Sequence, residues 1–329
     1  MDFIDRYKKL HSNFLEHSIE INTCPVCQSK DFIDIAKQLI RLLSYLIYYP
    51  NGDILRLCLC CGTVMANRIY PPQCYFQYLQ MFYGVRPGGR DEVLEKKARI
   101  RKDIATDLTK NFSFAPAAVL EVSCYDGSTL DLLAKDMKVD VWGVEPTLSA
   151  VDYAEKIYPH LKGKILGSTF EDSRDFCSAN SPFDIIILSY CFRQISNPLL
   201  ALEIILESLS DGGFVLVDEG DLLDDFLSAF DSEYFIRSLY QQKNYYYSLQ
   251  SLIYLFESHG FEFIRSVRIQ EATGVKLTYR GLVFRKTGVE RKDSERLRLA
   301  NYTGQVIAAA FEELAKPDAR IFKSLQKYS

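Results

Sequence analysis

The sequence predicts an α/β protein in which a mostly parallel, doubly wound sheet follows a small cysteine-rich module. Two observations lead to this fold class. Short apolar runs alternate with helical stretches from residue 117 onward, which is the order of a parallel sheet covered by helices. Five of the nine cysteines crowd into residues 24–61, before the first of these runs. A cluster of this kind indicates a separate module with its own chemistry.

Composition narrows the class of protein. The chain has 329 residues, enough for two domains, and its 39 basic and 43 acidic side chains give a net charge of −4. This balance argues against a broad surface for nucleic acid or an anionic membrane. The most apolar stretch, residues 39–49, is too short to cross a bilayer and contains Arg41. Charges interrupt the N-terminus, so we expect no signal peptide, a cytoplasmic location and reduced thiols.

The N-terminal half is predicted to consist of helix, module, hinge and helix. Apolar residues at helical spacing predict a helix over residues 2–18, and a second, charged helix is expected over 91–111. Between them, residues 22–75 hold the cysteines, and Pro87, Gly88 and Gly89 mark a hinge. The domain boundaries predicted from this pattern are 1–86, 87–290 and 291–329.

The α/β domain follows. Continuous apolar runs predict strands buried on both faces, at 118–122, 140–144, 164–167, 183–189 and 212–219. Helical stretches between and after them predict helices at 128–136, 148–157, 198–209 and 248–257. Residues 261–269 and 276–286 are expected to form a closing antiparallel pair, and residues 293–315 a terminal helix.

The cysteines are spaced as metal ligands. Cys24 and Cys27 form one CxxC pair, and Cys58 and Cys61 form another. Two such pairs can place four thiolates in the tetrahedral arrangement that zinc prefers, and a site closed by four sulfurs is structural. Cys60 is a surplus thiol that could compete for the metal, although the repeated spacing favours the other four. Buried core cysteines and a site that has lost its metal remain open alternatives.

The first strand of the α/β domain ends in a sequence typical of a nucleotide-cofactor site. Glu121 lies in the strand, Ser123 keeps the following turn small, and Asp126-Gly127 completes it. Gly127 is expected to let the backbone approach a ligand, and Glu121 or Asp126 to hold an ammonium group. This turn lacks the GxGxxG pattern of dinucleotide enzymes. The pattern therefore favours S-adenosyl-L-methionine (SAM).

Two further segments fit the same cofactor. Glu145-Pro146 ends the second strand, about 20 positions beyond the glycine turn, where a carboxylate can accept from both ribose hydroxyls. Phe170 is expected to pack on the adenine, with Glu171 or Asp172 accepting from its amino group. Ser189, at the end of the fourth strand, completes the predicted cofactor site.

With these motifs the chain resembles the class I SAM-dependent methyltransferases, which have a Rossmann-like domain. More narrowly, it resembles the deoxysugar C-methyltransferases that carry an N-terminal zinc-binding domain. The resemblance covers residues 22–286 and rests on the two cysteine pairs, Gly62, the aromatic segment 75–83 and residues 121–127. It implies that Tyr78 and Tyr83 close over the cofactor.

The family's Tyr-His-Glu-His signature is altered in this chain. Tyr240 is present, but Gln241, Gln242 and Lys243 replace the following three residues, and a His-Gly-Gly stretch is replaced by residues 271–274. Since the proton-transfer residues differ, methylation of oxygen or nitrogen is favoured over carbon. The catalytic candidates lie beyond the fourth and fifth strands and in the altered signature: Tyr190, Arg193, Gln194, Glu219, Asp221, Tyr240 and Lys243. The four histidines are expected to be structural or exposed, and an aromatic packing role for Tyr240 and residues 245–247 stays open.

The sequence therefore predicts a SAM-dependent methyltransferase acting on a small molecule, by resemblance a sugar or nucleotide-sugar. A SAM-binding protein without catalytic activity is one alternative. An RNA methyltransferase with a zinc module is another, disfavoured because basic and acidic residues offset each other in residues 22–75. The expected partner is the small acceptor, with neither nucleic acid nor a membrane, and a homodimer is left open.

Overall fold

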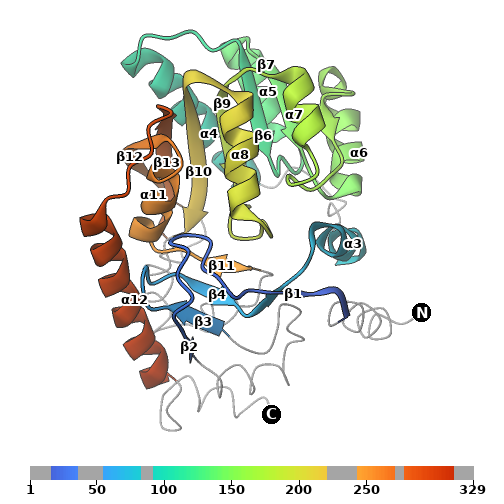
Figure 1. The fold of residues 1–329 in the computed structure, drawn as a ribbon. Coiled ribbons are helices and arrows are strands. Elements are labelled where there is room, and N and C mark those ends of the chain that lie inside the picture. Colours follow the sequence, from blue (N-terminus) through green and yellow to red (C-terminus); the bar gives the residue numbers. More distant parts are fainter. Residues whose placement is uncertain (1–15, 36–54, 83–91, 221–242, 271–277, 315–329) are drawn as a thin grey trace.

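The computed structural model describes residues 16–35, 55–82, 92–220, 243–270 and 278–314. A large sheet with helices on both faces lies at the top of Figure 1, and a smaller sheet lies below it. The predicted helix over residues 2–18 and the predicted hinge fall almost wholly outside the described residues. No helix in the described part of the chain combines the length and apolarity needed to cross a membrane.

The large sheet has the predicted topology. Its strand order is β12-β13-β10-β9-β6-β7-β8, and the five strands from β10 to β8 are parallel. β13 runs antiparallel to both of its neighbours and closes the sheet. In chain order the strands are β6 (Ala118–Val122), β7 (Asp140–Val144), β8 (Ile165–Leu166), β9 (Phe183–Ser189), β10 (Leu209–Gly220), β12 (Phe261–Gln270) and β13 (Thr278–Lys286). The expected closing antiparallel pair is confirmed.

Helices cover both faces of this sheet, because successive side chains of each strand point to opposite sides. In β9, Ile185 and Ile187 pack in one core with α4 (Glu92–Asn111), α5 (Ser128–Leu132) and α6 (Leu148–Ile157). Ile186 and Leu188 pack in the other core, with α7 (Arg174–Asn180), α8 (Pro198–Ser208) and α11 (Leu249–Glu257). The predicted helix over 128–136 ends as a π-helical turn, Leu133–Met137, and Pro159–Leu161 forms a 3₁₀ turn.

The smaller sheet contains strands that the sequence did not predict. β2 (Phe32–Ile35), β3 (Leu55–Cys58) and β4 (Val64–Ala66) are antiparallel neighbours, and β1 (Ile19–Glu20) pairs separately with β5 (Arg68–Ile69). The fourth strand of the small sheet is β11 (Tyr245–Tyr246), which comes from a distant part of the chain and pairs with β4. Strands of two to four residues are too short to show a period-2 pattern.

Two helices join the small sheet to the large one. α3 (Pro72–Phe82) follows β5 and includes most of the aromatic segment. Its Gln80 donates to the carbonyl of Pro146 and accepts from the amide of Leu148, and these two hydrogen bonds hold α3 to the loop after β7. α12 (Ser294–Leu314) runs along the side of the molecule and reaches the small sheet (Figure 1). There Gly304 packs directly against Gly62.

Candidate functional site

The four predicted metal ligands come together. The sulfur atoms of Cys24, Cys27, Cys58 and Cys61 all lie within 4.8 Å of one another, and we call this group the cysteine cluster. Three of the four side chains are fully buried. Cys60, which is half-buried, does not belong to the group. The structure thus brings together the four sulfurs that the repeated spacing favoured, and their role as zinc ligands stays a prediction.

The two CxxC pairs have matching backbones. After the first pair Gln28 has φ of 62°, and after the second Gly62 has φ of 69°. In each turn an amide donates back to the first cysteine's carbonyl: Gln28 N to Cys24 O, and Gly62 N to Cys58 O, both at 2.9 Å. Thr63 Oγ1 lies 3.1 Å from Cys61 Sγ. The cluster is held by a repeated local geometry, which pre-forms the site.

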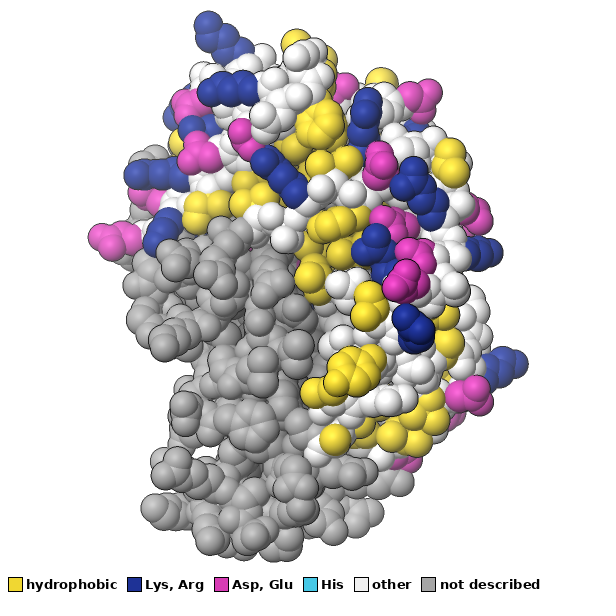
Figure 2. All heavy atoms as spheres, turned by 90° about the vertical axis from the view of Figure 1, so that its left-hand side faces the viewer, with side chains coloured by type: hydrophobic (Ala, Val, Ile, Leu, Met, Phe, Trp, Pro, Cys, Tyr) yellow, Lys and Arg dark blue, Asp and Glu magenta, His cyan; other side chains and the backbone are white. Residues whose placement is uncertain are grey.

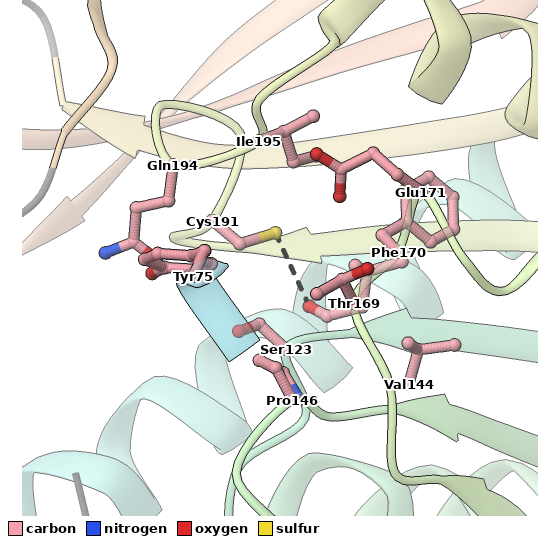
Figure 3. A pocket seen from close by; sticks show the side chains of 11 residues that line it. Tyr75, Ser123, Val144, Pro146, Thr169, Phe170, Glu171, Cys191, Gln194 and Ile195 are labelled. Carbon is pink, nitrogen blue, oxygen red and sulfur yellow. Dashed lines mark hydrogen bonds between the residues drawn. The ribbon is translucent and has the colours of Figure 1, made fainter. Parts of the chain in front are cut away.

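A pocket opens at the carboxyl ends of the parallel strands, where open α/β sheets bind ligands. Figure 3 shows side chains pointing into it from the loops after β6, β7, β8 and β9, and from α3. We call this the strand-end pocket. Its lining consists of Tyr75, Val122, Ser123, Val144, Pro146, Thr169, Phe170, Glu171, Cys191, Gln194 and Ile195. Of the predicted residues, Ser123, Pro146, Phe170, Glu171 and Gln194 line it.

The loop after β6 has an unusual backbone. The backbone φ angles of Ser123, Tyr125 and Gly127 are 61°, 46° and 75°, a left-handed conformation that residues other than glycine rarely adopt. Strain of this kind concentrates at functional sites. Glu145 helps to hold the loop, because its carboxylate accepts from Tyr125 N at 2.9 Å and from Thr147 N at 2.7 Å.

Glu145 is buried between the pocket-lining residues Val144 and Pro146. Burial raises the pKa of its carboxyl group, although the hydrogen bonds from Thr147 and Tyr125 oppose the shift. Each carboxylate oxygen has two lone pairs and uses one on a backbone amide. Glu145 can therefore still accept a ligand hydroxyl, and sequence reasoning missed its second role in fixing the loop.

Asp126 and Gly127 do not line the strand-end pocket. Asp126 accepts from the amide of Ser128, the first residue of α5, at 3.0 Å. A Cβ on Gly127 would lie 2.9 Å from Leu161 Cδ1 and 3.1 Å from Ala154 Cβ. Packing against α6 and the following 3₁₀ turn, together with the positive φ of 75°, requires glycine at this position. The predicted approach of the Gly127 backbone to a ligand stays a prediction.

Phe170 and Glu171 form one wall of the pocket (Figure 3). Glu171 accepts from Ser196 N at 2.6 Å with one carboxylate oxygen, and burial raises the pKa of its carboxyl group. Asp172, the other candidate for the adenine amino group, is exposed and accepts from Thr169 Oγ1. The geometry favours Glu171 over Asp172.

Glu121 and Ser189 lie in a buried network beside the pocket. Ser189 Oγ donates to Glu121 Oε1 at 2.6 Å, and Arg101 of α4 lies 3.6 Å from the same oxygen. Arg101 also donates to Asp218 at 2.6 and 3.0 Å. Burial raises the pKa of Glu121 to about 7, although Arg101 and Ser189 oppose the shift. Sequence reasoning missed Arg101 and Asp218, which are far apart in the chain.

The remaining catalytic candidates are only partly described. Tyr190, at φ of 55°, has the ammonium groups of Lys97 and Lys243 each 5.6 Å from its ring centre. Glu219 pairs with Arg193 at 2.9 Å, and both side chains are almost fully buried. Tyr240, Asp221 and Tyr83 lie outside the described residues and stay predictions.

The structure shows the contacts of two tyrosines from the aromatic segment and of two histidines. Tyr75, which sequence reasoning did not single out, lines the strand-end pocket, whereas Tyr78 stacks on Tyr70 with ring centres 6.0 Å apart. His160 lies 3.5 Å from Asp131, and His259 contacts the carbonyl of Leu255. None of the described histidines lines the pocket, as expected.

Comparison with known proteins identifies the family. A family model described as a methyltransferase domain matches residues 96–266, about half of the chain, and the chain belongs to this family. The match covers β6 to β10, the first part of β12 and every lining residue of the strand-end pocket except Tyr75. No curated protein matches the sequence.

Several solved methyltransferase structures are similar in part. The plantazolicin methyltransferase BpumL, in complex with SAH, is 15% identical, with 59% of this chain and 86% of that chain covered and a TM-score of 0.46. The N-methyltransferase NodS from Bradyrhizobium japonicum WM9 is 15% identical, with coverage of 60% and 98% and a TM-score of 0.43. Magnesium protoporphyrin IX methyltransferase (ChlM) from Synechocystis PCC 6803 is 10% identical, with coverage of 64% and 99% and a TM-score of 0.47.

Proposed function

We propose that this protein is a SAM-dependent methyltransferase acting on a small molecule. The observation that carries the proposal is the strand-end pocket. Its position at the carboxyl ends of β6, β7, β8 and β9, within the matched methyltransferase domain, brings a left-handed loop, an apolar wall and Glu171 together. This is the place and the chemistry that a nucleoside cofactor requires.

The residues present fit the cofactor. Phe170 would pack on the adenine, Glu171 would accept from its amino group, and Glu145 would accept from the ribose hydroxyls. Among the described residues, the buried Oε2 of Glu121 has no hydrogen-bond partner, so it could accept from the cofactor's ammonium group. SAM itself supplies a sulfonium methyl group that is open to attack by a nucleophile. The chain's contribution is to bind and align the reactants and to exclude water.

We also propose that the cysteine cluster binds one structural zinc ion. Four thiol groups within 4.8 Å cannot all ionise in a buried site unless a cation offsets their charge. The sulfurs would fill all four positions around zinc, so the metal would fold the module and take no part in catalysis.

For the acceptor we propose a sugar or nucleotide-sugar, by resemblance, methylated on oxygen or nitrogen. Gln194 lines the pocket and would contact the reactants, and Tyr190, Lys243 and Glu219 lie at the neighbouring strand ends. An amine acceptor needs only a neutral nitrogen in line with the methyl group. A hydroxyl acceptor needs a base, for which Glu219 or Tyr240 paired with Lys243 are the candidates.

One observation favours a second candidate, a SAM-binding protein without catalysis. Glu219 is held by Arg193 both through the guanidinium and through the backbone amide, which leaves this carboxylate committed to an ion pair. An RNA methyltransferase has less support. Figure 2 draws one face of the molecule. Basic and acidic side chains are interspersed over its described surface, without the continuous basic patch that RNA binding favours.

The experiment that tests the proposal is transfer of a radiolabelled methyl group from SAM to nucleotide-sugars that carry free hydroxyl or amino groups. We expect one of these acceptors to become labelled. Glu145→Ala should weaken binding of SAM and S-adenosylhomocysteine (SAH) alike by about 10- to 150-fold, because both contain the same ribose. Tight SAH binding without transfer to any acceptor would favour the non-catalytic candidate, and unchanged affinity in Glu145→Ala would place the ribose elsewhere.

A further inference from the structure

Residues 243–247 lie between the small sheet and the strand-end pocket, and we call them the connecting segment. On one side, β11 pairs with β4, and Ala66 N donates to Asn244 O at 2.9 Å. On the other side, Asn244 N donates to Arg193 O at 2.8 Å. A single short stretch is therefore hydrogen-bonded to the cysteine-containing module and to the loop after β9.

Asn244 makes the contact nearest to the pocket. Its side-chain amide donates to the carbonyl of Gln194 at 2.6 Å, and Asn244 is only 1% exposed. Gln194 lines the strand-end pocket (Figure 3). The next residue, Tyr245, donates through its hydroxyl to Ser196 O at 3.0 Å, and Ser196 N in turn donates to Glu171. The connecting segment thus holds the pocket wall formed by the loop after β9.

The same segment is close in structure to the cysteine cluster. Cys61 is followed by Gly62 and Thr63, and Thr63 leads straight into β4. Thr63 contacts the sulfur of Cys61, and its carbonyl accepts from Cys58 N at 2.9 Å. The turn that carries Cys61 and the amide of Ala66, which donates to Asn244 O, are separated only by β4. A shift of this turn would therefore displace β4 and, with it, Asn244.

We infer that Asn244 is a positioning residue that couples the cysteine cluster to the strand-end pocket. Zinc holds the second CxxC turn and β4, β4 holds Asn244, and Asn244 holds the backbone of Gln194 in its place in the pocket. This inference rests on the proposed function. Because coupling between two binding sites is reciprocal, zinc strengthens SAH binding and SAH strengthens zinc retention by the same factor.

The test is calorimetric titration of the full-length protein with SAH, once with zinc bound and once after a chelator has removed it. In the wild-type protein we expect zinc removal to weaken SAH binding by roughly 10-fold. The small sheet that positions Asn244 unfolds without the metal, and the buried hydrogen bond from Asn244 to Gln194 is lost with it. In Asn244→Asp the carboxylate keeps the side chain's shape but cannot donate to Gln194. This variant should bind SAH about 10-fold more weakly with zinc present, and zinc removal should weaken it little further.

Asn180→Asp is the matched control, since Asn180 also donates its amide to a backbone carbonyl, that of Phe176, but lies in α7 away from the pocket. It should keep both the wild-type affinity and its dependence on zinc. Zinc content and circular dichroism establish that each variant is folded. Competition for zinc by a coloured chelator, with and without SAH, measures the reciprocal effect in the wild-type protein and needs no variant.

Equal SAH affinity of the wild-type protein with and without zinc would overturn the coupling, and so would an Asn244→Asp variant that keeps the full dependence. If the zinc-loaded wild-type protein does not bind SAH at all, the proposed function fails, which is a different result from binding that ignores the metal.

Discussion

Substituting Gly304 by alanine should destabilise the protein, although alanine is the better helix former. Gly304 lies inside α12, and at an ordinary helix position this change would stabilise the fold by roughly 0.5–1 kcal/mol. Here α12 touches the second CxxC turn. A Cβ on Gly304 would overlap Gly62 Cα and lie 3.0 Å from the Gly62 carbonyl carbon and 3.1 Å from its oxygen. Backbone atoms cannot rotate away as a side chain can.

The magnitude follows from the displacement that is needed. Carbon atoms in contact lie about 3.5–4.0 Å apart, so α12 must move away from Gly62 by about 1.5–2 Å. Overpacking of this kind costs about 1–3 kcal/mol, occasionally more, and it acts against the gain in helix propensity. We therefore expect the free energy of unfolding to fall by about 1–2 kcal/mol.

The assay is urea unfolding of the zinc-loaded protein, together with the rate at which a chelator removes zinc. Gln305→Ala is the control, because Gln305 is exposed on the next position of the same helix and should change stability by less than about 0.5 kcal/mol. A Gly304→Ala variant as stable as the wild-type protein, or more stable, would refute the packing argument for α12.

Three further predictions concern the cysteine cluster, Glu121 and Tyr240, the last of which is a candidate from the sequence alone. Cys58→Ser should abolish stoichiometric zinc, measured by elemental analysis, and unfold the small sheet while the α/β core stays folded; zinc-free wild-type protein purified without chelators would contradict the site. The pKa of Glu121 is about 7 in the folded protein, compared with an ordinary value of 4.5. At a pH between these two values the folded chain therefore keeps a proton on Glu121 that the unfolded chain has released. The free energy of unfolding should therefore fall by roughly 3 kcal/mol as pH rises through that range, and Glu121→Gln should remove this fall in a series of urea titrations. Tyr240→Phe should lower turnover by about 10²-fold or more without changing SAH affinity if Tyr240 takes the acceptor's proton, and full activity would exclude that role.

The α/β domain was predictable because its strands are buried on both faces. Residues 118–122, 140–144 and 183–189 agree with the observed bounds of β6, β7 and β9. A fully buried strand needs a continuous apolar run, which is a strong local signal. The cysteine cluster was predictable for a similar reason, since metal ligands must be both reactive and correctly spaced.

Features that depend on distant parts of the chain were not predictable. β11 is two tyrosines in an aromatic tract, and only its pairing with β4 makes it a strand. Arg101 looks like one of several basic residues on a solvated helix, and its role depends on Asp218, 117 positions later. The reason for Gly127 was also hidden, because the side chains of Leu161 and Ala154 approach it only in the folded protein.

The central claim is that the strand-end pocket binds SAM and its product. Calorimetric titration of the zinc-loaded protein with SAH tests it most directly, with ATP and NADH as nucleotides that offer the same adenine. The account predicts one SAH bound per chain and much weaker binding of ATP and NADH. Both nucleotides lack the ammonium group for which we propose Glu121 Oε2 as the acceptor, and they carry phosphates in its place. No detectable SAH binding, or equal binding of all three nucleotides, would contradict it.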